Sequence, residues 1–335
     1  MATTLLCIHG RGQAAGDDIA RIPERLAAHV SGKKREWLGG LAKGLFAARH
    51  TAVREENVVF PFYGNTLADA IRAFEAAGGL PPDLGILAEE MPVEDAVLAE
   101  TKADALLNAA AALGFNAERE LSYIDPAMAA ELTDRDPDME LGWGDALRLP
   151  VLRAALQFVS RKTGAPAVII EQFLDDVAYY LEMPDMRKAV LDVIDNELRR
   201  AQPDGGDLVV VGHSLGSVVA YDFLNRLPAS YRVGQLVTAG SPLGYPVVQK
   251  NLLGAAAGRR PMVPSALPDR LGAWLNAYDV LDVVALIHPL TGSYDERTRG
   301  QITDTRTYNP SGPHSIVDYL SDPDVAGPIG RSLAT

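Results

Sequence analysis

Short, unbroken runs of apolar residues recur along the chain and predict the strands of a sheet. The run Leu208–Val211 has no polar interruption, which is typical of a strand buried on both faces of a parallel sheet. Further strands are predicted at Thr3–Ile8, Asn57–Phe62, Val233–Ala239, Gly272–Tyr278 and Gln301–Thr307. With helical stretches between the runs, the pattern predicts an α/β fold with a mostly parallel sheet.

Apolar residues recur at helical spacing between the first two predicted strands, which predicts a helix there. Asp17 or Asp18 can cap a helix that continues to about Val30 with one apolar face. The segment 32–50 is basic and interrupted by glycines, so we expect a loop and a short helix there. A strand, a helix and a strand at this spacing form a βαβ unit, which implies parallel pairing and a right-handed crossover.

The pattern changes between Asn65 and Pro184, where no run of residues predicts a strand. Apolar residues recur there at helical spacing, and the expected helices are Thr66–Ala77, Val93–Leu113, Asp145–Arg161 and Ala165–Leu181. A connection of roughly 120 residues needs structure of its own inside a compact domain. We therefore expect residues 65–186 to form a helical cap, inserted into a core made of residues 1–64 and 187–335.

Composition narrows the range of partners. The 335 residues carry a formal net charge of -13, which argues against nucleic acid and anionic membrane surfaces. The single cysteine, Cys7, rules out an internal disulfide, and the chain starts without the features of a signal peptide. No apolar stretch approaches membrane-spanning length, and no cysteine or histidine cluster has metal-ligand spacing. We expect a soluble, cytoplasmic protein without metal or cofactor, and the sequence leaves its oligomeric state open.

The stretch Asp207–Tyr221, DLVVVGHSLGSVVAY, carries the strongest chemical signal. It predicts a strand, a tight turn with Ser214 at its apex, and a helix. The glycines at 212 and 216 let strand and helix approach closely, and the turn holds the hydroxyl near the free N–H groups of a helix N-terminus. Ser214 is therefore the candidate nucleophile.

A serine nucleophile needs a base, and the base needs an orienting carboxylate. Among six histidines, His314 follows the last predicted strand, whereas His288 lies too close to the candidate acids to leave room for a strand. Asp279 and Asp282 both follow the strand Gly272–Tyr278, and either could instead cap the following turn. We favour Asp282, which with Ser214 and His314 gives the chain order serine, aspartate, histidine.

The remaining site residues are predicted from their positions. Oxyanion stabilisation needs two N–H groups, and we expect one from Leu215 and the other from Arg11 or Gly10, in the glycine-containing loop after the first strand. In the expected cap, the aromatic residues Phe173, Tyr179 and Tyr180 are the candidates for contact with substrate.

Five motifs together resemble the lipase/esterase-type α/β-hydrolases: IHGRGQ, GHSLGS, TAGSPLG, NAYDVLDVV and PHSIVDYL. The resemblance covers residues 1–64 and 187–325, and it implies that the second aspartate of the acid segment, Asp282, is the triad acid. The chain differs from that family's common plan because its first strand begins at residue 3, without preceding antiparallel strands. GHSLGSVVAYDFL, with FLDDVAYY upstream and HSIVDYLSDPDV downstream, also resembles phosphatidic-acid-preferring phospholipase A1, whose DDHD tetrad this chain lacks.

These observations predict a serine hydrolase that cleaves small-molecule or lipid carboxylic esters through an acyl-enzyme on Ser214. One alternative is thioester hydrolysis or acyl transfer with the same triad. A second alternative is a hydrolase fold that binds ligands without catalysis. The sequence leaves the acyl chain length and the leaving group open.

Overall fold

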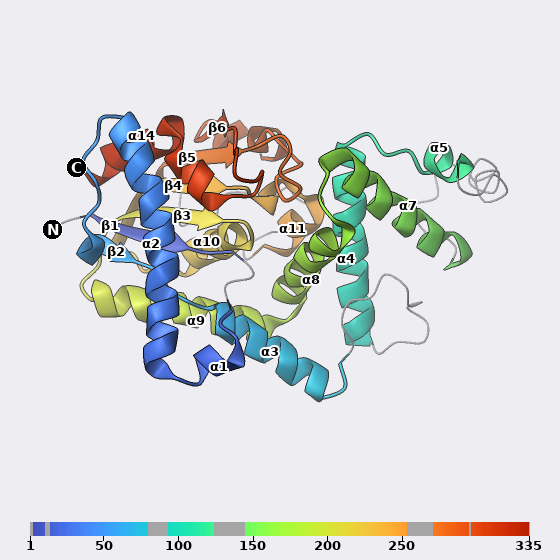
Figure 1. The fold of residues 1–335 in the computed structure, drawn as a ribbon, viewed down its shortest axis with the longest axis horizontal. Helices are drawn as coiled ribbons and strands as arrows, with labels where there is room; N and C mark the ends of the chain where they lie inside the picture. Colours follow the sequence, from blue (N-terminus) through green and yellow to red (C-terminus); the bar gives the residue numbers. More distant parts are fainter. Residues whose placement is uncertain are drawn as a thin grey trace.

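The computed structural model describes residues 3–10, 14–79, 93–123, 145–252, 271–294 and 296–334. Its centre is one sheet of six strands in the order β2-β1-β3-β4-β5-β6, and every neighbouring pair is parallel. The strands are β1 Thr4–Ile8, β2 Val58–Val59, β3 Gly206–His213, β4 Tyr231–Ala239, β5 Leu271–Tyr278 and β6 Ile302–Arg306. The predicted parallel α/β sheet is confirmed, with β2 shorter than expected (Figure 1).

Both faces of the sheet are buried, which explains why its strands have no polar alternation. Along β1, Leu5 and Cys7 pack on one face, whereas Leu6 and Ile8 pack on the other. The first face is covered by α2 (Pro23–Ala47), α13 (Ile316–Ser321) and α14 (Pro323–Leu333). The second is covered by α9 (Pro184–Ala201) and α10 (Leu215–Arg226), with α3 (Gly64–Ala76) against α9.

The predicted loop within residues 32–50 is wrong, because α2 continues unbroken from Pro23 to Ala47. Its glycines serve helix packing. A Cβ on Gly40 would lie 2.7 Å from the carbonyl oxygen of Val317, and one on Gly44 would lie 2.3 Å from that of Leu320. The helix packs this closely against α13 only because glycine has no side chain. The helix expected to continue to about Val30 is divided in two, because α1 (Asp17–Ala20) is short and residues 23–30 form the start of α2.

Helices alone fill the described parts of the region between β2 and β3, residues 65–79, 93–123 and 145–184. They include α4 (Val93–Ala112), α7 (Asp145–Thr163) and α8 (Ala167–Glu182), close to the predicted ranges, and α5 (Ala117–Ser122), which was not predicted. α4 and α8 pack beside α11 (Pro246–Asn251), which follows β4 (Figure 1). The Lys250 ammonium lies 2.8 Å from the Asp104 carboxylate, and the Asn251 amide donates to Glu182 over 3.0 Å.

The remaining regular elements are short. Among the described residues they are α12 (Glu296–Arg299) and three 3-10 helices, at Glu55–Asn57, Pro242–Gly244 and Leu290–Ser293. Within the described ranges, no helix combines the length and the apolar character needed to cross a membrane.

Candidate active site

Ser214 occupies a strained turn between β3 and α10. Its backbone angles are φ 58° and ψ -134°, in a region that residues with a Cβ rarely adopt. Neighbouring groups hold the turn in place. The Ser214 N–H donates to the carbonyl of Ala239 over 3.0 Å, and its own carbonyl accepts from Ser217. The predicted strand–turn–helix element with serine at its apex is present.

The loop after β1 presses against this turn. A Cβ on Gly10 would lie 2.6 Å from the Ser214 Cβ, and one on Gly216 would lie 2.3 Å from the carbonyl oxygen of Ile8. The two glycines therefore allow a contact that any larger residue would block. Ser214 is 3% exposed, so the serine is covered in this structure.

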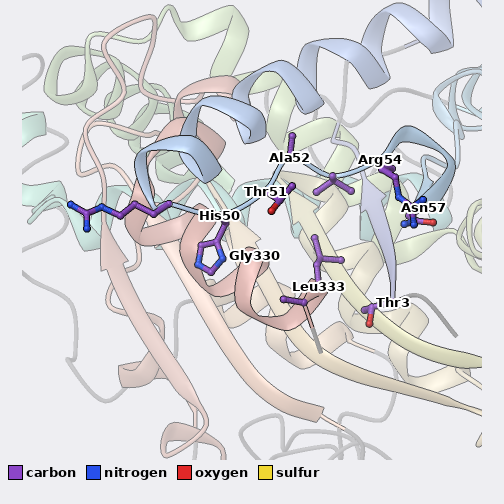
Figure 2. Close-up of a pocket in the computed structure, with 11 residues that line it drawn as sticks. Thr3, His50, Thr51, Ala52, Arg54, Asn57, Gly330 and Leu333 are labelled. Atoms are coloured by element: carbon purple, nitrogen blue, oxygen red, sulfur yellow. The ribbon is translucent and has the colours of Figure 1, made fainter.

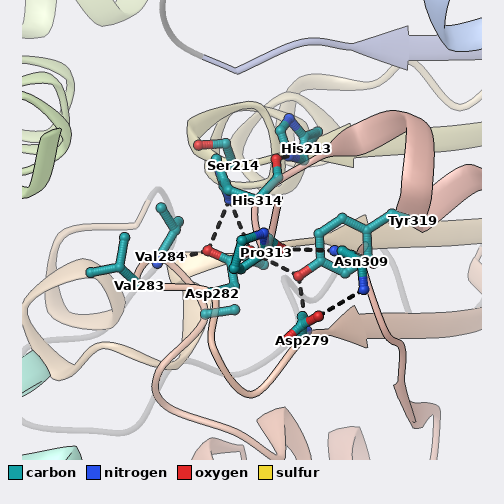
Figure 3. Close-up of polar contacts among 12 residues, drawn as sticks. His213, Ser214, Asp279, Asp282, Val283, Val284, Asn309, Pro313, His314 and Tyr319 are labelled. Carbon is teal, nitrogen blue, oxygen red and sulfur yellow. Dashed lines mark hydrogen bonds and ion pairs between the residues drawn. The ribbon is translucent and has the colours of Figure 1, made fainter. Parts of the chain in front are cut away.

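Asp282 and His314 meet at the same edge of the sheet, after β5 and β6 (Figure 3). The imidazole Nδ1 of His314 lies 2.8 Å from Oδ2 of Asp282 and 2.9 Å from Oδ1. Asp282 is fully buried, and its Oδ1 also accepts from the N–H of Val284 over 2.9 Å. A buried carboxylate in this position orients the ring and stabilises its protonated form.

Asp279, the other candidate acid, holds backbone groups instead. Its Oδ1 accepts from the N–H of Leu281 over 2.9 Å, and its Oδ2 accepts from the N–H of Asn309 over 2.8 Å. The Asn309 side chain in turn donates to the carbonyl of Pro313 over 2.7 Å. Asp279 thus connects the loop after β5 to the loop that carries His314, without contacting the imidazole.

The other histidines near the site have different partners. Nδ1 of His288 bonds to the carbonyl of Ala285 over 2.8 Å, and its ring stacks on Tyr278. The His213 ring lies 4.5 Å from the His314 ring, and its Nε2 bonds to the His314 carbonyl over 3.1 Å. Burial holds the pKa of His213 well below its usual range, so the ring is neutral and its Nε2–H is the donor.

Ser214 and His314 both lie in the described chain, and no hydrogen bond joins the Ser214 hydroxyl to the imidazole there. The residue before Ser214 nevertheless contacts His314 directly. Hydrogen bonds of this kind are often long without substrate and shorten only in the reactive complex.

Two of the three predicted oxyanion residues can be placed. Leu215 is buried and is the first residue of α10, where N–H groups lack partners within the helix. Gly10 lies against Ser214 from the loop after β1. Arg11 lies outside the described residues.

The loop after β1 is fixed by a pair of residues that the sequence analysis did not identify. The buried ring of His9 stacks on Tyr63 with centroids 4.2 Å apart, and the Tyr63 hydroxyl donates to the His9 carbonyl. Nδ1 of His9 lies 2.7 Å from the Gly10 carbonyl, and Nε2 accepts from the Tyr63 N–H over 3.2 Å. These contacts require the neutral tautomer with its proton on Nδ1. They also hold His9 in place directly before Gly10. The sequence contains no spacing that would have paired positions 9 and 63.

Acidification should destabilise the protein through His9. Burial lowers the pKa of His9 to about 4, whereas an unfolded histidine titrates near 6.5. Below pH 6.5 the unfolded chain binds a proton that the folded chain does not bind, so folding stability falls as the pH decreases towards 4. Between pH 7 and pH 5 this single group should cost about 2 kcal/mol, measurable as a lower urea midpoint.

A His9→Gln variant should lose about 2 kcal/mol less stability than the parent between the same two pH values. His50→Gln, at a partly exposed histidine, should follow the parent and serves as the control. Identical pH dependence in the parent and in His9→Gln would contradict the assignment of a neutral, buried His9.

The predicted substrate contacts lie in α8. Phe173 is buried, and its ring meets that of Tyr245 with centroids 6.4 Å apart. Tyr179 packs edge-on against Phe74, and its buried hydroxyl has no partner in the described chain. Tyr180 is fully buried, and its hydroxyl donates over 3.0 Å to Asp222 in α10.

Asp222 also forms a buried ion pair with Arg187, whose guanidinium lies over the Tyr180 ring. The Arg187 Nε lies 2.7 Å from the Asp222 carboxylate, and another guanidinium nitrogen donates to the Asn251 carbonyl over 2.8 Å. Tyr180, Asp222 and Arg187 together therefore join α8 to α9, α10 and α11. Phe173 is linked to the acid loop through Tyr245, whose hydroxyl donates to the Val283 carbonyl over 3.1 Å.

A hollow of about 480 Å³ lies at the end of the sheet opposite to Ser214, where β1 begins (Figure 2). Its walls include Thr3, His50, Arg54 and Gly330. Thr3 immediately precedes β1, whereas Ser214 follows the carboxyl end of β3, and these strands are parallel. The hollow is therefore separate from the group formed by Ser214, Asp282 and His314.

Comparisons of this chain with protein-family models, with curated proteins and with solved structures found no match. Across the residues that the structure describes, no group of three or more histidine, cysteine, aspartate or glutamate side chains could hold a metal ion.

Proposed function

We propose that this protein is a serine hydrolase of the α/β-hydrolase type, which cleaves carboxylic esters through an acyl-enzyme on Ser214. The observation that carries the proposal is the buried carboxylate of Asp282, bonded to Nδ1 of His314 at the sheet edge where Ser214 lies in a strained turn. The nucleophile follows β3, the acid follows β5 and the histidine follows β6, which is the chain order of the α/β-hydrolase triad.

In the proposed reaction, the Ser214 hydroxyl attacks the ester carbonyl while Nε2 of His314 takes its proton. Asp282 holds the ring with Nδ1 protonated and stabilises the imidazolium that forms. The N–H of Leu215 and an N–H from the loop at Gly10 and Arg11 stabilise the oxyanion. His314 then protonates the leaving alcohol, and a water molecule, deprotonated by the same imidazole, releases the acid from Ser214. The chemistry uses only side chains, backbone groups and water.

The helices between β2 and β3 are the proposed source of substrate specificity. Phe173 of α8 packs on Tyr245, which bonds to the residue directly after Asp282. A small-molecule or lipid ester would meet this apolar wall on its way to the triad.

A fluorophosphonate probe tests the proposal, because it reacts covalently with an activated serine. We expect mass spectrometry to find the adduct on Ser214, and no adduct in Ser214→Ala. The matched control is Ser230→Ala, which removes an exposed serine and should leave labelling unchanged.

Absence of labelling in the folded parent would favour the non-catalytic binding module. A series of p-nitrophenyl esters and acyl thioesters, each with and without an added acyl acceptor, separates ester hydrolysis from thioester hydrolysis and acyl transfer. Preferential hydrolysis of the oxygen esters supports the proposal.

A further inference from the structure

Tyr319 lies in α13, five residues after His314, and its side chain is fully buried. Its hydroxyl lies 2.8 Å from Oδ2 of Asp282 and 2.9 Å from the backbone nitrogen of Asp279 (Figure 3). The phenol therefore stands between the two aspartates that follow β5.

The direction of both hydrogen bonds follows from the groups involved. A backbone N–H can only donate, so the Tyr319 oxygen accepts from Asp279. The single phenol proton is then directed at Asp282, which as a carboxylate can only accept. Burial, together with the charge of Asp282, raises the pKa of Tyr319, so the hydroxyl keeps the proton that it donates.

The phenol is one of three groups around the Asp282 carboxylate. The Val284 N–H donates to Oδ1, the imidazole of His314 spans both oxygens, and Tyr319 donates to Oδ2. Without the phenol, the imidazole would be the one partner that Oδ2 keeps among the described residues. A hydrogen bond to a buried charge is stronger than one between neutral groups. Its loss would therefore leave the charged carboxylate less stabilised.

The same hydroxyl also belongs to the connection between the two loops of the site. It accepts from the backbone of Asp279, whose carboxylate holds Asn309, and Asn309 holds the carbonyl of Pro313, the residue before His314. Ser315 caps α13 through the N–H of Asp318, which fixes the helix that carries Tyr319 directly after His314. The relative positions of Asp282 and His314 are thus fixed through Tyr319 as well as through the direct contact between the two residues.

We propose that Tyr319 is a positioning residue for the triad, which orients the Asp282 carboxylate and limits its basicity through the hydrogen bond to Oδ2. The proposal rests on the proposed function, because it concerns the same aspartate and histidine. Nothing in the local sequence marks Tyr319, so the assignment depends on the folded geometry.

The proposal predicts in which direction the titration midpoint of His314 moves when the phenol is removed. Removing the phenol donor makes the Asp282 carboxylate more basic, and a more basic carboxylate stabilises the imidazolium. His314 would then hold its proton up to a higher pH. In the part of the chain that the structure describes, Asp279, His213 and Tyr245 are ionisable groups against this pair, and the substitution leaves them in place.

The test is a pH titration of the full-length Tyr319→Phe protein, followed by imidazole ¹⁵N chemical shifts. We expect the midpoint of the His314 titration to rise by about 0.5 to 1 pH unit relative to the parent, the effect of losing one hydrogen bond to the carboxylate. The acid limb of kcat/KM should move with it. The matched control is Tyr231→Phe, which removes another buried hydroxyl, bonded to the Gln202 carbonyl, and should leave the midpoint unchanged.

In a second variant, the midpoint of the His314 titration should move in the opposite direction. Site-specific 3-fluorotyrosine at position 319 is a stronger donor to Asp282 and keeps the ring packed, so it should lower the midpoint. An unchanged or lower midpoint in Tyr319→Phe, or an unchanged or higher one with 3-fluorotyrosine, would overturn the positioning role. Because the shifts are read without substrate, they separate this role from the proposed function, which fails independently if Ser214 is not labelled.

Discussion

His314→Ala should reduce kcat for ester hydrolysis by on the order of 10⁴-fold or more, while the protein stays folded. The imidazole is partly exposed and is not part of the apolar core, so its removal costs little packing. Without it, the proposed mechanism has no base for the proton of the Ser214 hydroxyl, and the buried Asp282 carboxylate loses the imidazole that it orients. Steady-state kinetics on a p-nitrophenyl ester that the parent cleaves, with circular dichroism as the folding check, measure the effect.

His288→Ala is the matched comparison, because His288 is the other histidine beyond the acid segment. Its Nδ1 bonds to the Ala285 carbonyl and its ring stacks on Tyr278, so its removal should change kcat far less. A larger loss in His288→Ala than in His314→Ala would move the base to His288. Losses of similar, small size in both variants would remove the triad from the mechanism.

Strand positions and the serine turn were predictable because buried parallel strands leave a strong local signal. The run Leu208–Val211 has no polar residue because both faces of β3 are covered, and the glycines that follow it mark the sharp turn. The edge strand β2 was predicted at the right place but too long. The apolar run continues to Phe62, whereas only Val58 and Val59 pair with β1, the one neighbour of this edge strand.

The glycines of α2 show where local reasoning failed. Glycine lowers helix propensity, so a segment with several glycines is read as a break. In the fold, Gly40 and Gly44 face the backbone of α13, and the close helix contact outweighs the propensity cost. Only the position of α13, which lies far along the chain, reveals this function of the two glycines.

The acid segment shows a different limit. Asp279 and Asp282 follow the same strand, and both side chains cap backbone N–H groups in the loop, Asp279 at Leu281 and Asp282 at Val284. The two differ in their tertiary partners. The Asp282 carboxylate contacts His314, whereas the Asp279 carboxylate accepts from Asn309, and both partners lie in the loop after β6. The sequence could narrow the choice to two residues, whereas the contact that distinguishes them is tertiary.

Asp282→Asn should lower kcat by on the order of 10⁴-fold, the scale known for this substitution in a protease triad. An amide in place of the carboxylate presents an N–H₂ group as well as an oxygen to Nδ1 of His314. The imidazole can then adopt the tautomer with its proton on Nε2, which cannot accept the proton of Ser214. Steady-state kinetics give the loss in kcat, and ¹⁵N chemical shifts of the imidazole report the tautomer directly.

Asp279→Asn is the matched variant, with the same chemical change three residues earlier. It should weaken one of the backbone hydrogen bonds that link the two loops and cost about 1–3 kcal/mol of folding stability, with a much smaller loss in kcat. Its effect should therefore be larger in urea unfolding than in turnover, whereas Asp282→Asn should show the larger effect in turnover. The reverse ranking in kcat would make Asp279 the triad acid, and the observed contact between Asp282 and His314 would then be structural.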